Sequence, residues 1–137
     1  MPTPASPRKN RLPALGFVSL VVLTAQFLLG MDAALFFKFP ETGSRWAAAS
    51  SGLVGVHVIL GSLMVLFAIV LLVLAIRGRK PRWLIASIVG LVGIGAAWYF
   101  GTLFVQADSD PASYLMSCGF ALAFLGYGWG LWAGERT

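Results

Sequence analysis

Few residues of this 137-residue chain have side chains capable of chemistry. His57 is the only histidine and Cys118 the only cysteine, so the chain can form neither an intramolecular disulfide nor a Cys/His zinc cluster. A neutral imidazole among apolar helices can, however, serve as an axial ligand of haem iron. Met116 would supply the second ligand of a His/Met pair, Met64 lies two turns along the same helix as His57, and a second copy of the chain could supply its own His57. The sequence therefore makes haem b the candidate cofactor, with His57 as the residue that binds its iron.

A purely structural role for the same residues competes with haem binding. His57 can satisfy its hydrogen bonding through Gln26, Tyr99 or a main-chain carbonyl on a neighbouring helix, and Met116 can simply fill space. In both interpretations we expect one pocket in the outer half of a helix bundle, bordered by Gln26, His57, Tyr99 and Met116. The sequence pairs no nucleophile with a base and places no two carboxylates within the apolar runs. No catalytic residue is therefore expected, and an enzyme is the least supported class.

The composition indicates which elements must position these residues. Of all residues, 58% are hydrophobic and 11% are charged, and the mean hydropathy is +0.85, as in proteins that reside in lipid. Four apolar runs are long enough to cross a bilayer as helices. We predict an all-α, single-domain integral membrane protein with spans at about 14–36, 48–76, 83–105 and 113–133. Residues 1–12 are polar and proline-rich, so we expect a disordered cytoplasmic tail there rather than a signal peptide.

The basic residues predict the orientation of the bundle. Lys38 and Arg45 flank one end of the spans, whereas the other end carries Arg8, Lys9, Arg11, Arg77, Arg79, Lys80, Arg82 and Arg136. By the positive-inside rule, both termini and the turn at 77–82 are cytoplasmic, and the chain crosses the cell (plasma) membrane up-down-up-down. The net charge of +5 then indicates contact with anionic lipid headgroups rather than with nucleic acid.

Rows of small residues mark one face of each predicted span. In lipid, such rows indicate where helices pack closely. The rows on the third and fourth spans are Gly90, Gly93, Ala97 and Gly101, and Gly119, Ala123, Gly126 and Gly130. Contacts of this kind form within one chain or between chains. The expected partners are therefore a second copy of this chain or another membrane protein.

The second span carries a resemblance to known proteins. Residues 56–75, VHVILGSLMVLFAIVLLVLA, resemble the His-x-x-Leu-Gly helix of heme A synthase halves and other small b-type cytochrome bundles. The resemblance implies that His57 faces haem and that Gly61 permits close approach. Those bundles carry a further histidine on a later helix, where this chain has SYLMSCG at 113–119, so bis-histidine ligation within one chain is not expected. The layout of AQFLLG in the first span and PRW after the basic turn is similar to uncharacterised four-helix actinobacterial membrane proteins, which implies a bacterial protein.

Three functions are compatible with these features. The first is a non-enzymatic accessory or interaction subunit of a membrane complex or homo-oligomer, because packing signals are abundant and catalytic groups are not. The second is a haem- or quinone-linked electron-transfer component that uses His57. The third is a protein that binds or transports a lipid or another apolar small molecule between Gln26, His57 and Tyr99. An ion-coupled transporter is disfavoured, because no charged residue lies deep within a span.

Overall fold

Four long helices form the structure, a computed structural model that describes residues 11–133. Each of the four is long and apolar enough to cross a membrane, as expected of a multi-pass membrane protein. A short fifth helix lies in the connection between the first two long ones. The helices are α1 (Leu12–Phe36), α2 (Arg45–Ala49), α3 (Gly52–Arg77), α4 (Pro81–Ala107) and α5 (Asp110–Trp132). The described residues include no strand, so the prediction of an all-α chain with four long apolar helices is confirmed for this part of the chain.

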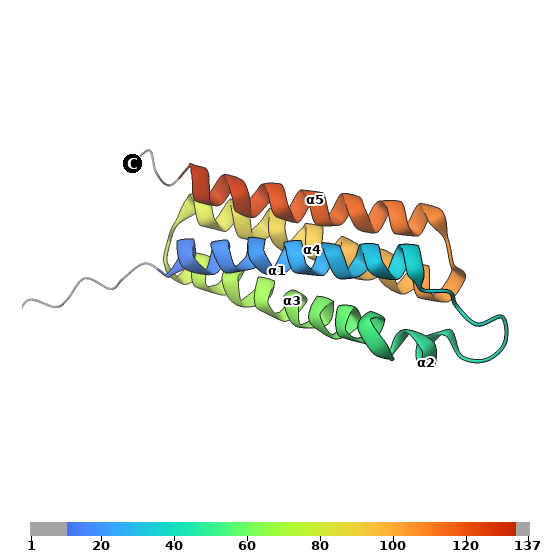
Figure 1. The fold of residues 1–137 in the computed structure, drawn as a ribbon. Helices are drawn as coiled ribbons and strands as arrows, with labels where there is room; N and C mark the ends of the chain where they lie inside the picture. Colours follow the sequence, from blue (N-terminus) through green and yellow to red (C-terminus); the bar gives the residue numbers. More distant parts are fainter. Residues whose placement is uncertain (1–10, 134–137) are drawn as a thin grey trace, which may run out of the picture.

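The four long helices lie side by side, and successive ones run in opposite directions (Figure 1). Each packs against two neighbours: α1 against α3 and α5, and α4 against α3 and α5. The connections between α3 and α4 and between α4 and α5 are short, which requires antiparallel neighbours. The start of α1 therefore lies beside the end of α3, and the end of α1 lies beside the starts of α3 and α5 (Figure 1).

The second span begins later than the sequence predicts. We expected one helix over 48–76, but the chain forms the separate helix α2, breaks at Ser50 and Ser51, and starts α3 at Gly52. The hydroxyls of the two serines donate to the carbonyls of Trp46 and Ala48, at 2.7 and 2.8 Å. Such local side-chain bonds compete with helical hydrogen bonding. Gly52 then adopts a φ of +57°, a left-handed conformation that glycine tolerates at little cost.

The other predicted boundaries differ from the structure by a few residues. α4 and α5 start at Pro81 and Asp110, earlier than predicted, and both have a proline in their first turn, where its missing N–H is not needed. Residue 12 belongs to α1 rather than to the expected tail. Residues 1–10 of that tail lie outside the described residues, as does the end of the chain from 134.

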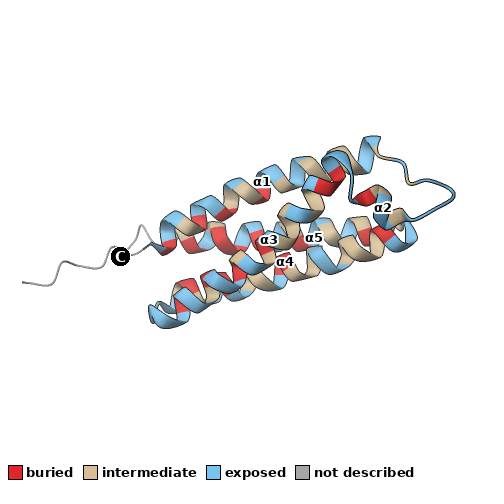
Figure 2. Cartoon of the chain, turned by 90° about the horizontal axis from the view of Figure 1, so that it is seen from below, coloured by how far each residue is buried: buried red, intermediate tan, exposed pale blue. Residues whose placement is uncertain are grey.

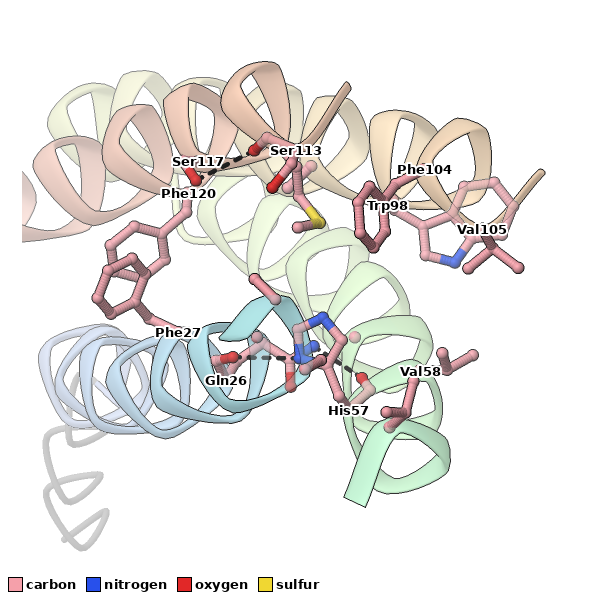
Figure 3. Close-up of a pocket in the computed structure, with 18 of the residues that line it drawn as sticks. Gln26, Phe27, His57, Val58, Trp98, Phe104, Val105, Ser113, Ser117 and Phe120 are labelled. Atoms are coloured by element: carbon pink, nitrogen blue, oxygen red, sulfur yellow. Dashed lines mark hydrogen bonds between the residues drawn. The ribbon is translucent and has the colours of Figure 1, made fainter. Parts of the chain in front are cut away.

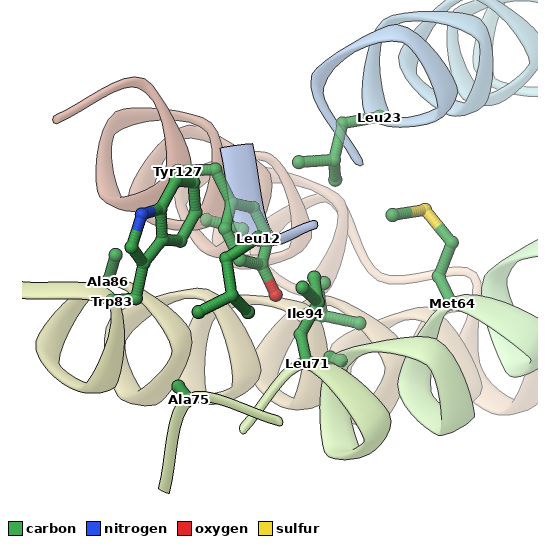
Figure 4. Packing of buried hydrophobic residues seen from close by; sticks show 11 residues of the cluster. Leu12, Leu23, Met64, Leu71, Ala75, Trp83, Ala86, Ile94 and Tyr127 are labelled. Atoms are coloured by element: carbon green, nitrogen blue, oxygen red, sulfur yellow. The ribbon is translucent and has the colours of Figure 1, made fainter. Parts of the chain in front are cut away.

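Small residues allow α4 and α5 to make the closest contact in the bundle. A side chain at Gly93 of α4 would overlap backbone atoms of α5, and a side chain at Gly119 of α5 would overlap backbone atoms of α4. We call the end of the bundle that contains the turn between α3 and α4 the basic end. Towards it, larger buried side chains fill the space between the helices, among them Trp83, Leu71 and Tyr127 (Figure 4). Tyr127 packs against Gly90, and Trp83 packs against Gly16 and Gly130. This half of the bundle is closely packed.

Large apolar side chains cover the outside of the bundle. Phe17, Leu28, Ile59 and Leu125 are each more than half exposed, at 61, 63, 62 and 68%. The buried residues form inward-facing stripes (Figure 2). Because lipid chains are as apolar as these side chains, such an exterior is stable in a bilayer and unstable in water. The exterior therefore agrees with the predicted residence in a membrane.

Candidate ligand-binding cavity

A cavity of about 160 Å³ lies between the four long helices, in the half of the bundle that contains the end of α1 and the starts of α3 and α5. Apart from a few polar side chains, its walls are apolar. Seven of the lining residues are aromatic: Phe27, Phe37, Phe39, Trp46, Trp98, Phe104 and Phe120. An engineered apolar cavity of about 150 Å³ holds one benzene molecule, so this space accommodates a ligand of about one six-membered ring.

Gln26 of α1 and His57 of α3 are joined by two reciprocal hydrogen bonds on the cavity wall (Figure 3). The Nε2 atom of Gln26 donates to the main-chain carbonyl of His57 at 2.7 Å. The Nδ1 atom of His57 lies 3.1 Å from the main-chain carbonyl of Gln26. The structure thus shows the hydrogen-bonded arrangement that the sequence offered for His57, with both Gln26 and a carbonyl of the neighbouring helix taking part.

Two glycines make this pair of hydrogen bonds sterically feasible. A Cβ atom added at Gly30, one turn after Gln26, would lie 3.0 Å from Cε1 of His57. A Cβ atom added at Gly61, one turn after His57, would lie 2.8 Å from Nε2 of Gln26. The segments QFLLG at 26–30 and HVILG at 57–61 therefore play matching roles on two antiparallel helices. Each provides one polar side chain and the glycine that admits the partner's side chain.

The hydrogen bond to Gln26 determines which nitrogen of His57 carries the proton. A carbonyl oxygen only accepts hydrogen bonds, so Nδ1 must be the donor. In a neutral imidazole the other nitrogen, Nε2, is then an acceptor with a free lone pair. It makes no hydrogen bond to another described residue and faces the cavity (Figure 3). The Oε1 atom of Gln26, a second acceptor, is buried and also lacks a partner among the described residues.

Met116 and Trp98 complete the wall from α5 and α4. The sulfur of Met116 lies against Gly101 of α4, 3.3 Å from where a Cβ would stand. The indole N–H of Trp98 donates to the hydroxyl of Ser62 at 3.2 Å, which links α4 to α3. Met116 is therefore a lining residue, as the sequence predicts, and it fills the space beside a glycine.

Aromatic rings border the end of the cavity nearest the connection between α1 and α3. The rings of Phe37 and Phe39 meet edge to face with centroids 5.1 Å apart, and the ring of Phe104 lies 5.8 Å from that of Phe39. The guanidinium of Arg45 lies 5.3 Å from the ring centroid of Phe39 and 4.0 Å from the carboxylate of Asp108. We refer to residues 37–46 together with Phe104 and Asp108 as the aromatic cap. It covers the end of the cavity nearest the connection between α1 and α3.

Six of the residues that line the cavity are exposed. Four of them lie on two helices: Phe27, Met31 and Ala34 on α1 and Ser117 on α5. The other two are Trp46 of α2 and Trp98 of α4. The rings of Phe27 and Phe120 stack with centroids 4.8 Å apart and bridge α1 and α5.

Three of the four residues predicted to border the pocket do so: Gln26, His57 and Met116. Tyr99 does not line the cavity, because its side chain points outward, is 54% exposed and packs against the ring of Phe100. Its neighbour Trp98 lines the cavity in its place. Phe39 and Phe104 were not predicted as site residues, because nothing in the sequence indicates that the connection after α1 folds back over the bundle.

The small-residue faces pack within the chain. Glycines of α1, α3, α4 and α5 lie against side chains or backbone of neighbouring helices, whereas added Cβ atoms at Gly95 and Gly128 would meet nothing within 4 Å. The accessory-subunit hypothesis rested on these faces, and most of them are already in contact within one chain. That hypothesis stays a prediction, with little unpaired glycine surface to support it.

Haem does not fit the cavity in this structure. A carbonyl on Nδ1 and a free Nε2 are what an iron-binding histidine requires, and Met116 lines the same cavity. The space, however, has the volume of one small ring rather than of a four-pyrrole macrocycle. Among residues 11–133 no group of three His, Cys, Asp or Glu side chains could hold a metal ion.

Comparisons with family models, curated proteins and solved structures gave no match for the chain.

Proposed function

We propose that this protein binds a small, predominantly apolar molecule that enters from the membrane between α1 and α5. The observation that carries the proposal is the cavity of about 160 Å³, with apolar and aromatic walls and with exposed lining residues on α1 and α5. Concave, mostly apolar sites with a few positioned polar groups are typical of small-molecule binding. The close packing of the opposite half of the bundle provides the rigid frame that such a site needs.

Toluene is a suitable probe, because it is a single six-membered ring without hydrogen-bonding groups. In nanodiscs of deuterated lipid, we expect saturation transfer from the protein to toluene. Ala34→Phe places a ring at the proposed entry and should abolish the transfer, because Ala34 is exposed and lines the cavity. Ala25→Phe is the matched control, because Ala25 lies on the exposed face of α1 away from the cavity. Equal transfer in both variants, or none in the unmodified protein, would overturn the proposal.

We further infer that the aromatic cap lies outside the cell and the basic end of the bundle in the cytoplasm of a cell whose plasma membrane holds the protein. Asp32, Glu41, Asp108 and Asp110 lie at or near the capped end. The opposite end carries Arg11, Arg77, Arg79, Lys80 and Arg82, where the positive-inside rule and anionic headgroups favour basic residues. Both termini are then cytoplasmic, and the proposed entry between α1 and α5 faces the outer leaflet.

A cysteine-labelling experiment tests this orientation. In a Cys118→Ser background, Thr42→Cys should react with a membrane-impermeant maleimide in intact cells, whereas Arg79→Cys should react only after permeabilisation. Both positions are exposed, at opposite ends of the bundle. The reverse labelling pattern would show that the chain is inverted.

A further inference from the structure

We propose that the ligand is a phenol-type molecule, a single aromatic ring whose hydroxyl donates a hydrogen bond to Nε2 of His57. The inference rests on the proposed function, since it assigns the chemical class of the molecule in the same cavity. It follows from which hydrogen-bonding groups of the wall are already used and which remain.

The imidazole of His57 presents only an acceptor to the cavity. The N–H at Nδ1 of His57 and one of the two N–H groups of the Gln26 amide donate to main-chain carbonyls, so the imidazole keeps no donor for a ligand. Nε2 of His57 and Oε1 of Gln26 keep unused lone pairs. Of these two, Oε1 is buried, whereas Nε2 faces the cavity (Figure 3). A ligand that pairs with Nε2 must therefore bring an O–H or N–H group.

The other walls favour an aromatic ring as the body of the ligand. Rings surround the cavity from several elements, including Phe37, Phe104 and Trp98. Aromatic rings attract one another in offset or edge-to-face arrangements in addition to their burial of apolar area. The indole N–H of Trp98, which would otherwise favour a ligand with a carbonyl, donates to Ser62 instead. A hydroxylated ring therefore satisfies both the apolar walls and the free nitrogen.

Phenol and toluene form a matched pair of probes, because a hydroxyl replaces a methyl group of similar size. Affinities are measured in nanodiscs and referred to the partition of each compound into protein-free lipid. We expect phenol to bind about fivefold more tightly than toluene on this scale, the ratio that one neutral hydrogen bond of about 1 kcal/mol provides. Equal affinities would overturn the inference and leave the proposed function intact. Binding of neither compound would overturn both.

His57→Asn separates the two nitrogens of the ring. The asparagine amide retains a donor near the position of Nδ1 for the carbonyl of Gln26 and removes the acceptor at Nε2. The variant should bind phenol and toluene with equal affinities on the partition-corrected scale, because the preference for phenol is lost. A retained preference would show that the hydroxyl pairs elsewhere.

A spectroscopic measurement tests the contact without any substitution. Because His57 is the only histidine, selective ¹⁵N-histidine labelling reports on this side chain alone. Phenol should shift the Nε2 resonance strongly, whereas toluene at equal occupancy should leave it nearly unchanged. Equal shifts with both compounds would contradict the hydrogen bond, even if His57→Asn did not fold.

Discussion

Gln26 and His57 each hydrogen-bond the main-chain carbonyl of the other, and each side chain lies against the glycine one turn beyond its partner. Both acceptors are backbone atoms, so they survive substitution of either side chain. The two bonds hold α1 against α3 on the cavity wall and leave one imidazole nitrogen free. The same pair therefore contributes to stability and to the polar character of the site.

The first prediction concerns the hydrogen bond from Gln26. Gln26→Leu should destabilise the bundle by about 1 kcal/mol, because one interhelical hydrogen bond in a membrane contributes about that much. Unfolding in mixed detergent micelles measures the difference. Thr24→Val is the control, since the Thr24 hydroxyl bonds only within its own helix, to the carbonyl of Leu20. Equal stability of the two variants would show that the Gln26 bond contributes nothing.

The second prediction concerns two glycines of α4 that lie two residues apart. A methyl group at Gly93 would stand 2.6 Å from backbone atoms of Gly119 and Ala123, whereas one at Gly95 would meet nothing within 4 Å. Gly93→Ala should therefore destabilise the bundle by about 1–3 kcal/mol through overpacking. Gly95→Ala should be neutral or stabilising by up to about 1 kcal/mol, because alanine favours the helix. A larger loss for Gly95→Ala would indicate that this open face meets a second chain.

The third prediction concerns the aromatic cap. Arg45→Ala removes both the contact with Phe39 and the ion pair with Asp108. Because both ionic groups are partly exposed, global stability should change by less than about 1 kcal/mol. Amide hydrogen exchange across 38–46 should nevertheless accelerate, since the connection loses its attachment to α4. Lys38→Ala, a loss of charge on the same exposed connection, should leave this exchange unchanged, and equal acceleration in both variants would contradict the role of Arg45.

The fourth prediction concerns the opposite end of the bundle. The guanidinium of Arg82 donates to the carbonyl of Ala133 at 2.7 Å and so caps the end of α5. Arg82→Met should increase amide exchange in the last turn of α5 and lower stability by about 1 kcal/mol. Arg79→Met, an equal loss of charge on the same turn, should have little effect, because Arg79 is exposed. If the two variants behave alike, net charge at this end matters rather than the cap.

The sequence predicts the helices better than their contacts. Long apolar runs are strong signals because a helix needs about 20 such residues to cross a membrane. The break at Ser50 and Ser51 was missed, since it depends on two hydroxyls that bond backward to specific carbonyls. Trp98 and Tyr99 show a second limit. Adjacent residues of a helix point about 100° apart, so only one of them can face the cavity. The helix rotation that decides between them is set by packing against α3 and α5.

The site itself was partly predictable for a related reason. Gln26 and His57 carry strongly polar side chains within apolar runs, so their inward direction follows from the cost of facing lipid, and Met116 shares a stripe with the small residues of α5. The hydrogen-bond partners of Gln26 and His57 cannot be predicted from the sequence, because both acceptors are main-chain carbonyls, which every residue possesses. Phe39 was unpredictable from periodicity, since it lies in a connection without regular structure.

The reciprocal pair also determines how far α3 can slide along α1. Sliding α3 along α1 by a single turn would break both hydrogen bonds at once and place side chains where the two glycines now leave room. The axial register of these two helices is therefore specified by two five-residue segments. Since α4 packs on α3 and α5 packs on α1, the same register determines the depth of the cavity between the four helices.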